Sequence, residues 1–168
     1  MIQKKICLLG GFGVGKTSLV SRYVHSMFSD KYLTTVGVKI DKKSVQVDGT
    51  DVDLVIWDIY GQDDYQKVRM SYLRGAAGYL LVVDGTRRST LDTALALHDS
   101  AQATVPGASF TLVINKADLA YQFEVTDDLL DVLVARGWRV LKTSAKTGDD
   151  VDAAFVTLAR AMIQGEGQ

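Results

Sequence analysis

Ten residues near the N-terminus combine glycines, a lysine and a hydroxyl in a spacing that suits phosphate binding. The segment LGGFGVGKTS contains the pattern Gly10-x-x-x-x-Gly15-Lys16-Thr17. Glycines let successive N–H groups turn toward an anion, and the start of a helix adds partial positive charge. Lys16 supplies a charge for the outer phosphates, and Thr17 offers a hydroxyl to Mg²⁺. We therefore predict a phosphate-binding loop rather than a plain glycine-rich turn.

A second polar motif, Asn115-Lys116-Ala117-Asp118, follows the apolar segment FTLVI. A carboxylate such as Asp118 accepts both of the adjacent N–H donors at N1 and N2 of guanine, whereas adenine presents an acceptor at N1 and no amine beside it. In isolation the motif is explained equally well as an ordinary polar loop. Its position after a strand, at the same edge as the phosphate loop, favours a guanine site.

A third segment, Ser144-Ala145-Lys146, follows the strand-like segment WRVLKT. Backbone N–H groups here could donate to the O6 atom of guanine. Because this segment also follows a strand, we expect it to lie beside the second motif.

The elements that must position these motifs follow from the apolar pattern. Strand-like segments lie at 6–9, 79–83, 110–114 and 138–141, and helix-like segments at 16–26, 64–74, 90–104, 126–136 and 149–163. Strands separated by helices of this length indicate parallel βαβ units. The ligand crevice of such a sheet lies at the carboxyl ends of its strands.

One pair of strands has a different connection. Alternating apolar residues near 36–47 and 52–56 flank the turn dipeptide Asp48-Gly49. This pattern predicts an antiparallel hairpin. The predicted fold is α/β: a six-stranded, mostly parallel sheet with one antiparallel edge strand and helices on both faces.

Two helices carry signals at their limits. Thr126 is placed to cap the N-terminus of the helix predicted at 126–136, and Gly137 to end it in a left-handed conformation. In the last helix the apolar residues 151, 154, 155, 158, 159 and 162 share one face, which indicates packing against the core.

Composition limits the class of protein. The 168 residues suit one domain, and 19 basic against 20 acidic residues argue against nucleic-acid binding. The single cysteine, Cys7, excludes a disulfide within the chain. The sequence shows no signal peptide and no apolar run of about 20 residues, so a cytoplasmic location is expected.

With these motifs in place, the sequence resembles the Ras superfamily of small GTPases, nearest the Ras and Rab branches, over essentially its whole length. The segments GGFGVGKT, TTVG, WDIYGQ, NKAD and TSAK occur in the family's order and spacing. The resemblance implies the P-loop NTPase fold over a single domain, residues 1–168. It also implies binding of GTP and GDP with Mg²⁺.

The resemblance also assigns roles to residues that the first three motifs do not include. Thr35 resembles the residue that ligates Mg²⁺ and meets the γ-phosphate, and Asp58 the carboxylate that holds Mg²⁺ through water. Gly61 resembles the N–H that senses the γ-phosphate, and Gln62 the residue that orients the attacking water. Phe28 matches the aromatic that packs on guanine, opposite the stem of Lys116.

The expected site can be stated as three sets. The catalytic residues are Lys16, Thr35 and Gln62, and the Mg²⁺ ligands are Thr17, Thr35 and Asp58. The nucleotide-binding residues are Gly11, Phe12, Gly13, Val14, Gly15, Lys16, Thr17, Ser18, Phe28, Thr35, Asp58, Gly61, Asn115, Lys116, Asp118, Ser144, Ala145 and Lys146.

Two segments, near 30–40 and 60–73, are expected to change with the nucleotide, because Thr35 and Gly61 both need the γ-phosphate. The resemblance implies that effectors, exchange factors and activating proteins bind there. Side chains in the second segment that are candidate partner anchors, or parts of a packed helix, are Tyr65, Val68, Arg69, Tyr72 and Leu73.

The chain departs from the family at two positions that are usually small, Phe12 and Tyr60. Both rings should approach the γ-phosphate side of the site and crowd Gln62, although Phe12 could instead lie flat on the surface. The chain also ends AMIQGEGQ without a C-terminal cysteine, and Ile2 stands where N-myristoylation needs glycine. We therefore expect no direct membrane anchor, unless a tail is missing from this sequence.

Three functions compete at this point. A GTP-hydrolysing switch with slow turnover is favoured by the presence of Gln62, Thr35 and Asp58. A guanine-nucleotide-binding interaction module with negligible hydrolysis is the alternative, because of the two bulky rings. An ATP-using kinase is disfavoured by the Asn-Lys-x-Asp motif and by the lack of an evident acceptor-binding lid.

Overall fold

A computed structural model of the protein describes residues 2–26, 38–59 and 70–165. The strands are β1 (Ile2–Gly10), β2 (Val38–Val47), β3 (Thr50–Ile59), β4 (Ala76–Asp84), β5 (Ser109–Asn115) and β6 (Val140–Lys142). The α-helices are α1 (Lys16–His25), α2 (Ser89–Thr104), α3 (Asp127–Ala135) and α4 (Val151–Gly165). Short 3₁₀ helices span η1 (Met70–Leu73) and η2 (Ala117–Gln122).

The six strands form one sheet in the order β2-β3-β1-β4-β5-β6. Strand β2 pairs with β3 antiparallel, through the turn at Asp48-Gly49, and every other pair is parallel. The expected mostly parallel sheet with one antiparallel edge strand is thus confirmed. Its parallel strands carry the carboxyl ends of β1, β3, β4, β5 and β6 to one edge.

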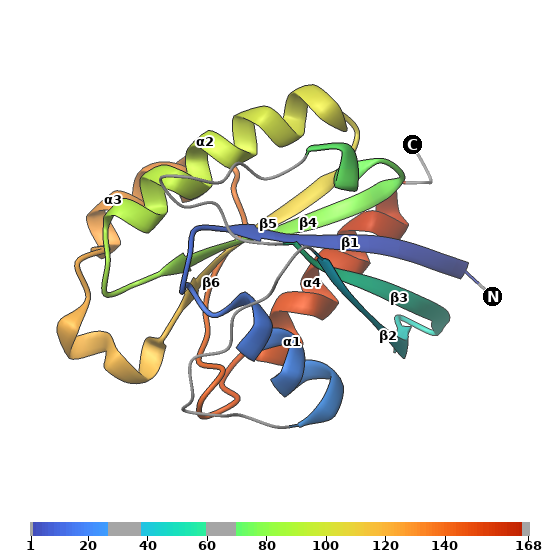
Figure 1. Ribbon diagram of the computed structural model, residues 1–168, viewed down its shortest axis with the longest axis horizontal. Coiled ribbons are helices and arrows are strands. Elements are labelled where there is room, and N and C mark those ends of the chain that lie inside the picture. The colour runs from blue at the N-terminus through green and yellow to red at the C-terminus, as the bar shows by residue number, and fades with distance from the viewer. Residues whose placement is uncertain (1, 27–37, 60–69, 166–168) are drawn as a thin grey trace.

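Helices cover both faces of the sheet (Figure 1): α1 and α4 lie on one side, and α2 and α3 on the other. Strand β1 contributes to both layers because its side chains alternate. Ile6 and Leu8 pack with α1 and α4, whereas Cys7 and Leu9 pack with α2 and its neighbours. Both faces of the central strands are therefore buried, as expected for a parallel sheet.

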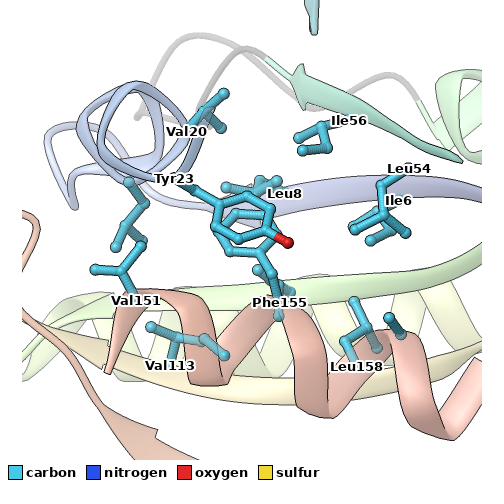
Figure 2. Close-up of a cluster of buried hydrophobic side chains, with 14 of the residues drawn as sticks. Ile6, Leu8, Val20, Tyr23, Leu54, Ile56, Val113, Val151, Phe155 and Leu158 are labelled. Atoms are coloured by element: carbon cyan, nitrogen blue, oxygen red, sulfur yellow. The ribbon is translucent and has the colours of Figure 1, made fainter. Parts of the chain in front are cut away.

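On the α1–α4 side, Tyr23 stacks on Phe155 (Figure 2), with ring centroids 4.0 Å apart and planes within 1°. All six residues of the predicted core face of the last helix are buried: Val151, Ala154, Phe155, Leu158, Ala159 and Met162. This stacked pair packs α1, the helix that follows the phosphate loop, against the C-terminal helix α4.

Element limits differ from the predicted ones in places. Strand β1 begins at Ile2 rather than at residue 6, because its backbone pairs with β3 from Val52 onward whatever the side chains of residues 2–5. Thr126 stands at the N-cap of α3, but its side chain makes no capping hydrogen bond, so the predicted cap is wrong. Gly137, with a φ of 91°, ends that helix region as predicted.

Cys7 is fully buried in β1, and burial raises the pKa of its thiol to about 12. A buried thiol with a raised pKa is unreactive, because the thiolate is the reactive form. Within residues 2–26, 38–59 and 70–165, no helix is long and apolar enough to cross a bilayer.

Candidate nucleotide-binding site

The phosphate loop lies at residues 10–15, between the end of β1 and the start of α1. Gly13 and Gly15 have φ angles of 73° and 103°, a region that favours glycine. A Cβ atom on Gly15 would lie 2.3 Å from Nδ2 of Asn115, so only glycine fits there. Ser18 lies, partly buried, in the first turn of α1.

Lys16 is buried against the loop that it follows. Its Nζ atom donates to the carbonyls of Gly10 and Gly11, at 3.2 and 3.3 Å. Burial lowers the pKa of Lys16 to about 8, and the charge of Asp58 opposes that change. Burial destabilises the charged form of this ammonium, and a nearby anion would stabilise it. The Lys16 side chain is therefore suited to bind a phosphate oxygen.

Asn115, at the end of β5, bonds two other loops. Its Nδ2 atom donates to the carbonyl of Val14 in the phosphate loop, at 3.1 Å. Its Oδ1 atom accepts from Thr143 Oγ1 at 3.2 Å and from the N–H of Ala145 at 3.3 Å. Because Asn115 is 2% exposed, this amide is a buried junction between the phosphate loop and the predicted base-binding loops.

The two predicted base-binding segments lie side by side. Ser144 Oγ donates to Asp118 Oδ1 at 2.7 Å. Arg22, from α1, holds the same loop by donating to the carbonyls of Ala145 and Lys146, at 2.8 and 2.5 Å. The structure therefore brings Asp118 next to residues 144–146, as the strand order predicts.

The N–H groups of residues 144–146 are not equivalent. That of Ser144 donates to the carbonyl of Asp149 at 3.1 Å, and that of Ala145 makes the long bond to Asn115. The N–H of Lys146 has no hydrogen bond to another described residue. Of the backbone N–H groups expected to donate to guanine O6, that of Ser144 is already bonded to Asp149. The N–H of Lys146 remains a candidate, and that of Ala145 could donate only in competition with its bond to Asn115.

Lys116 follows Asn115 in a left-handed conformation, with a φ of 69°. Its Nζ atom lies 2.9 Å from Oδ2 of Asp84, a buried carboxylate at the end of β4. The same Oδ2 atom accepts from Nε of Arg87 at 2.9 Å. The ion pair with Asp84, at the end of the neighbouring strand β4, therefore orients the Lys116 side chain.

Thr17 and Asp58 lie together although they are 41 positions apart in the chain. Thr17 Oγ1 donates to Asp58 Oδ2 at 2.6 Å, at the point where β3 meets the start of α1. A hydroxyl and a carboxylate are hard oxygen donors of the type that Mg²⁺ prefers, so the donor chemistry fits that ion. In the described part of the chain, no three His, Cys, Asp or Glu side chains form a metal-binding cluster.

Phe12 is 43% exposed, and its backbone carbonyl accepts from Nη2 of Arg87 at 2.8 Å. The phosphate loop thus accommodates this aromatic residue at the surface of the site. Tyr60, the ring expected to approach Phe12, lies outside the described residues.

Several predicted site residues also lie outside them: Phe28, Thr35, Gly61 and Gln62. The predicted partner-binding segments are described only at residues 38–40 and 70–73, so Tyr65, Val68 and Arg69 are not covered. Leu73 is fully buried, and Tyr72 packs on Trp57 with ring centroids 6.2 Å apart. Leu73 is therefore a core residue rather than a partner anchor.

Four residues of the site were missed by the sequence analysis: Arg22, Asp84, Arg87 and Thr143. Asp84 directly follows the apolar strand YLLVV, so the strand-end rule that placed Asn115 would have found it. The two arginines carry no such signal, because a cation on a helix or loop is usually solvated.

The sheet, with a phosphate loop between β1 and α1 and polar motifs at neighbouring strand ends, defines a P-loop nucleotide-binding protein. Comparison with known proteins narrows this class. The sequence model of the Ras family matches residues 5–164. The Ras-related protein Rab-1 of Theileria parva is 34% identical over 94% of this chain and 73% of its own length.

Two further relatives agree with this result. The Ras-related protein Rab-1 of Theileria annulata is 33% identical over the same shares of the two chains, 94% and 73%. The Ras-related protein Rab-13 of Mesocricetus auratus is 32% identical over 97% of this chain and 81% of its own. The chain therefore belongs to the Ras family of small GTPases, which are GTP-binding proteins.

Proposed function

We propose that the protein is a single-domain molecular switch that binds GTP and GDP with Mg²⁺ and hydrolyses GTP slowly. Membership of the Ras family supports the general class. The observation that carries the proposal is the Asn115 amide, which bonds both the phosphate loop at Val14 and the base-side loop at Ala145. In this proposal one buried side chain would set the spacing between the phosphate site and the guanine site.

In this proposal Asp118 accepts the N1 and N2 donors of guanine, and Phe28 with the stem of Lys116 encloses the ring. Lys16 and the inward N–H groups of the phosphate loop neutralise the phosphates. Of these residues, Lys116 and Asp118 follow the carboxyl end of β5, and Lys16 follows the loop after β1.

Thr17 and Asp58, together with Thr35, would hold Mg²⁺. When bound, the ion would offset negative charge on the β- and γ-phosphates as the terminal bond breaks. The hydrogen bond between Thr17 and Asp58 keeps both donors at one point, which supports their assignment to one ion.

For hydrolysis, Gln62 would orient water for attack on the γ-phosphate, with Lys16 and Thr35 stabilising the charge that develops. Loss of the γ-phosphate would remove the contacts of Thr35 and Gly61. Segments 30–40 and 60–73 would then change, and effectors, exchange factors and activating proteins would distinguish the two forms there.

Phe12 supports the proposal of slow hydrolysis. An exposed aromatic on the phosphate loop would occupy space that Gln62 and an incoming arginine need. The same observation supports the second candidate, a guanine-nucleotide-binding module with negligible hydrolysis. The two differ in one measurable quantity, the rate of the chemical step.

Single-turnover hydrolysis of radiolabelled GTP separates the candidates. We expect slow but measurable hydrolysis by the wild type and a rate roughly tenfold higher in Phe12→Gly, because removing the ring restores the position of the attacking water. Val132→Ala, which removes an exposed apolar side chain on α3, is the control and should match the wild type. Tight GTP binding with no hydrolysis would favour the module, and a Phe12→Gly rate no higher than wild type would refute the obstruction.

A further inference from the structure

The phosphate loop must turn its N–H groups toward the phosphates, so its carbonyls point outward and need donors of their own. Three side chains supply such donors from outside the loop backbone. Lys16 donates to Gly10 and Gly11, Asn115 to Val14, and Arg87 to Phe12. Lys16 and Asn115 belong to recognised motifs, but Arg87 belongs to none.

Arg87 lies in the segment between β4 and α2, and its guanidinium makes two contacts in different directions. Nη2 donates to the carbonyl of Phe12 at 2.8 Å, and Nε donates to Asp84 Oδ2 at 2.9 Å. A Cβ atom on Gly13 would lie 3.3 Å from Nη2, so the guanidinium also sits against the middle of the loop. The planar fork of arginine suits this bridge.

Asp84 is a firm anchor for that bridge because its side chain is only 2% exposed and is fully engaged. Oδ1 accepts from the N–H and the hydroxyl of Thr86, at 2.9 and 2.7 Å, and Oδ2 accepts from both Arg87 and Lys116. Burial alone would raise the pKa of Asp84, but the hydrogen bonds from Thr86, Lys116 and Arg87 hold it below its usual value. The carboxylate is therefore charged at neutral pH.

We propose that Arg87 is a positioning residue for nucleotide binding: anchored on Asp84, it holds the backbone at Phe12 and Gly13 in the conformation that receives the phosphates. The inference rests on the proposed binding of GTP and GDP and adds a residue to it. Because Asp84 also holds Lys116, one buried carboxylate connects the phosphate loop with the guanine motif.

The bridge differs from a simple effect of positive charge near the phosphates. A lysine at position 87 would keep the charge but has a single ammonium in place of the fork, so it could not reproduce both bonds in this geometry. The second phosphate of GDP adds contacts to the loop that GMP lacks. A mispositioned loop should therefore weaken GDP binding more than GMP binding, whereas a general loss of structure weakens both.

The test measures GDP and GMP affinity by displacement of a fluorescent GDP analogue from the wild type, Arg87→Ala and Arg87→Lys. Arg88→Ala is the matched control, because it removes an adjacent positive charge while leaving the backbone N–H that donates to Glu124. We expect Arg87→Ala to weaken GDP binding by about tenfold and GMP binding by less than about threefold. Arg87→Lys should resemble Arg87→Ala, and Arg88→Ala the wild type.

Three results would overturn the inference alone: GDP affinity unchanged in Arg87→Ala, equal losses for GDP and GMP, or full recovery in Arg87→Lys. Because the Arg87 side chain is 44% exposed, its replacement should leave folding intact, and thermal unfolding of each variant checks this. A wild type that binds no guanine nucleotide would overturn both the proposed function and the inference.

Discussion

The candidate nucleotide site contains a few buried polar side chains, each of which has hydrogen-bond partners in the neighbouring loops and helices. Asn115 is 2% exposed and Asp58 and Asp84 are each 1% exposed, and all three have protein partners. Burying such groups costs free energy unless hydrogen bonds compensate. These separate hydrogen bonds orient the three side chains without a ligand, and such preorganisation reduces the entropy lost on binding.

Asp118→Asn should change the base that the protein prefers. An amide can donate to the extra carbonyl of xanthine, whereas the carboxylate can only accept. We expect affinity for GDP to fall by at least about tenfold and affinity for xanthosine diphosphate to rise, measured by competition with a fluorescent nucleotide. Asp131→Asn, on the exposed side of α3, should leave both affinities unchanged, and equal losses for the two nucleotides in Asp118→Asn would contradict the assignment.

Thr17→Asn should weaken GTP binding more than GDP binding when Mg²⁺ is present, because an ion held at Thr17 would offset the charge of the γ-phosphate, which GDP lacks. A second experiment removes Mg²⁺ with a chelator. The wild type should then lose its preference for GTP over GDP, whereas the affinities of Thr17→Asn for the two nucleotides should change little. Isothermal titration with each nucleotide measures both effects. Equal losses for GTP and GDP would contradict the role of Thr17 as a metal ligand.

At this scale the sequence reveals residues whose role is local and misses those whose role depends on a distant contact. Asn115 and Asp118 are predictable because they follow a strand and match a chemical pattern. The role of Arg87 is not predictable from the sequence, because it depends on a hydrogen bond to a carbonyl 75 positions away in the chain. The sequence also does not reveal that the N–H of Ser144 is bonded to the carbonyl of Asp149, because that contact depends on the conformation of the loop.

At the scale of elements, the turns after β1, β5 and β6 bring three motifs to one edge of the sheet. Strand and helix types were predictable because apolar periodicity reflects burial directly. The first and last residues of each element are harder to predict. Polar residues at the start of β1 join the sheet through backbone pairing, which the side-chain pattern does not show. Thr126 has the right position for a cap but no capping bond, which only side-chain geometry reveals.

The stacked pair of Tyr23 and Phe155 fixes α1 against α4 and so supports the helix that follows the phosphate loop (Figure 2). Phe155→Ala should destabilise the protein by about 3–5 kcal/mol, because it removes a fully buried ring and leaves a cavity. Urea unfolding measures this change. Asp152→Ala, exposed on the same helix, should fall within about 0.5 kcal/mol of the wild type, and a Phe155→Ala effect as small would contradict the packing account.

At the scale of the whole molecule, one sheet and two helical layers carry the phosphate, base and metal residues to a common edge (Figure 1). The helices and the hydrophobic cores support the phosphate, base and metal residues alike, so the fold alone does not determine which nucleotide binds. We propose that this choice rests on Asp118 and residues 144–146, whose loops contact one another and are bonded by Asn115 and Arg22. The central claim of a guanine-specific switch is therefore a claim about selectivity.

The most direct test measures the affinity of the purified wild type for GTP and for ATP under identical conditions, with Mg²⁺ present, by competition with one fluorescent guanine nucleotide. We expect GTP to bind at least about a thousandfold more tightly, because a site built to hydrogen-bond N1 and N2 leaves its carboxylate unpaired against adenine. ATP bound as tightly as GTP would contradict the account.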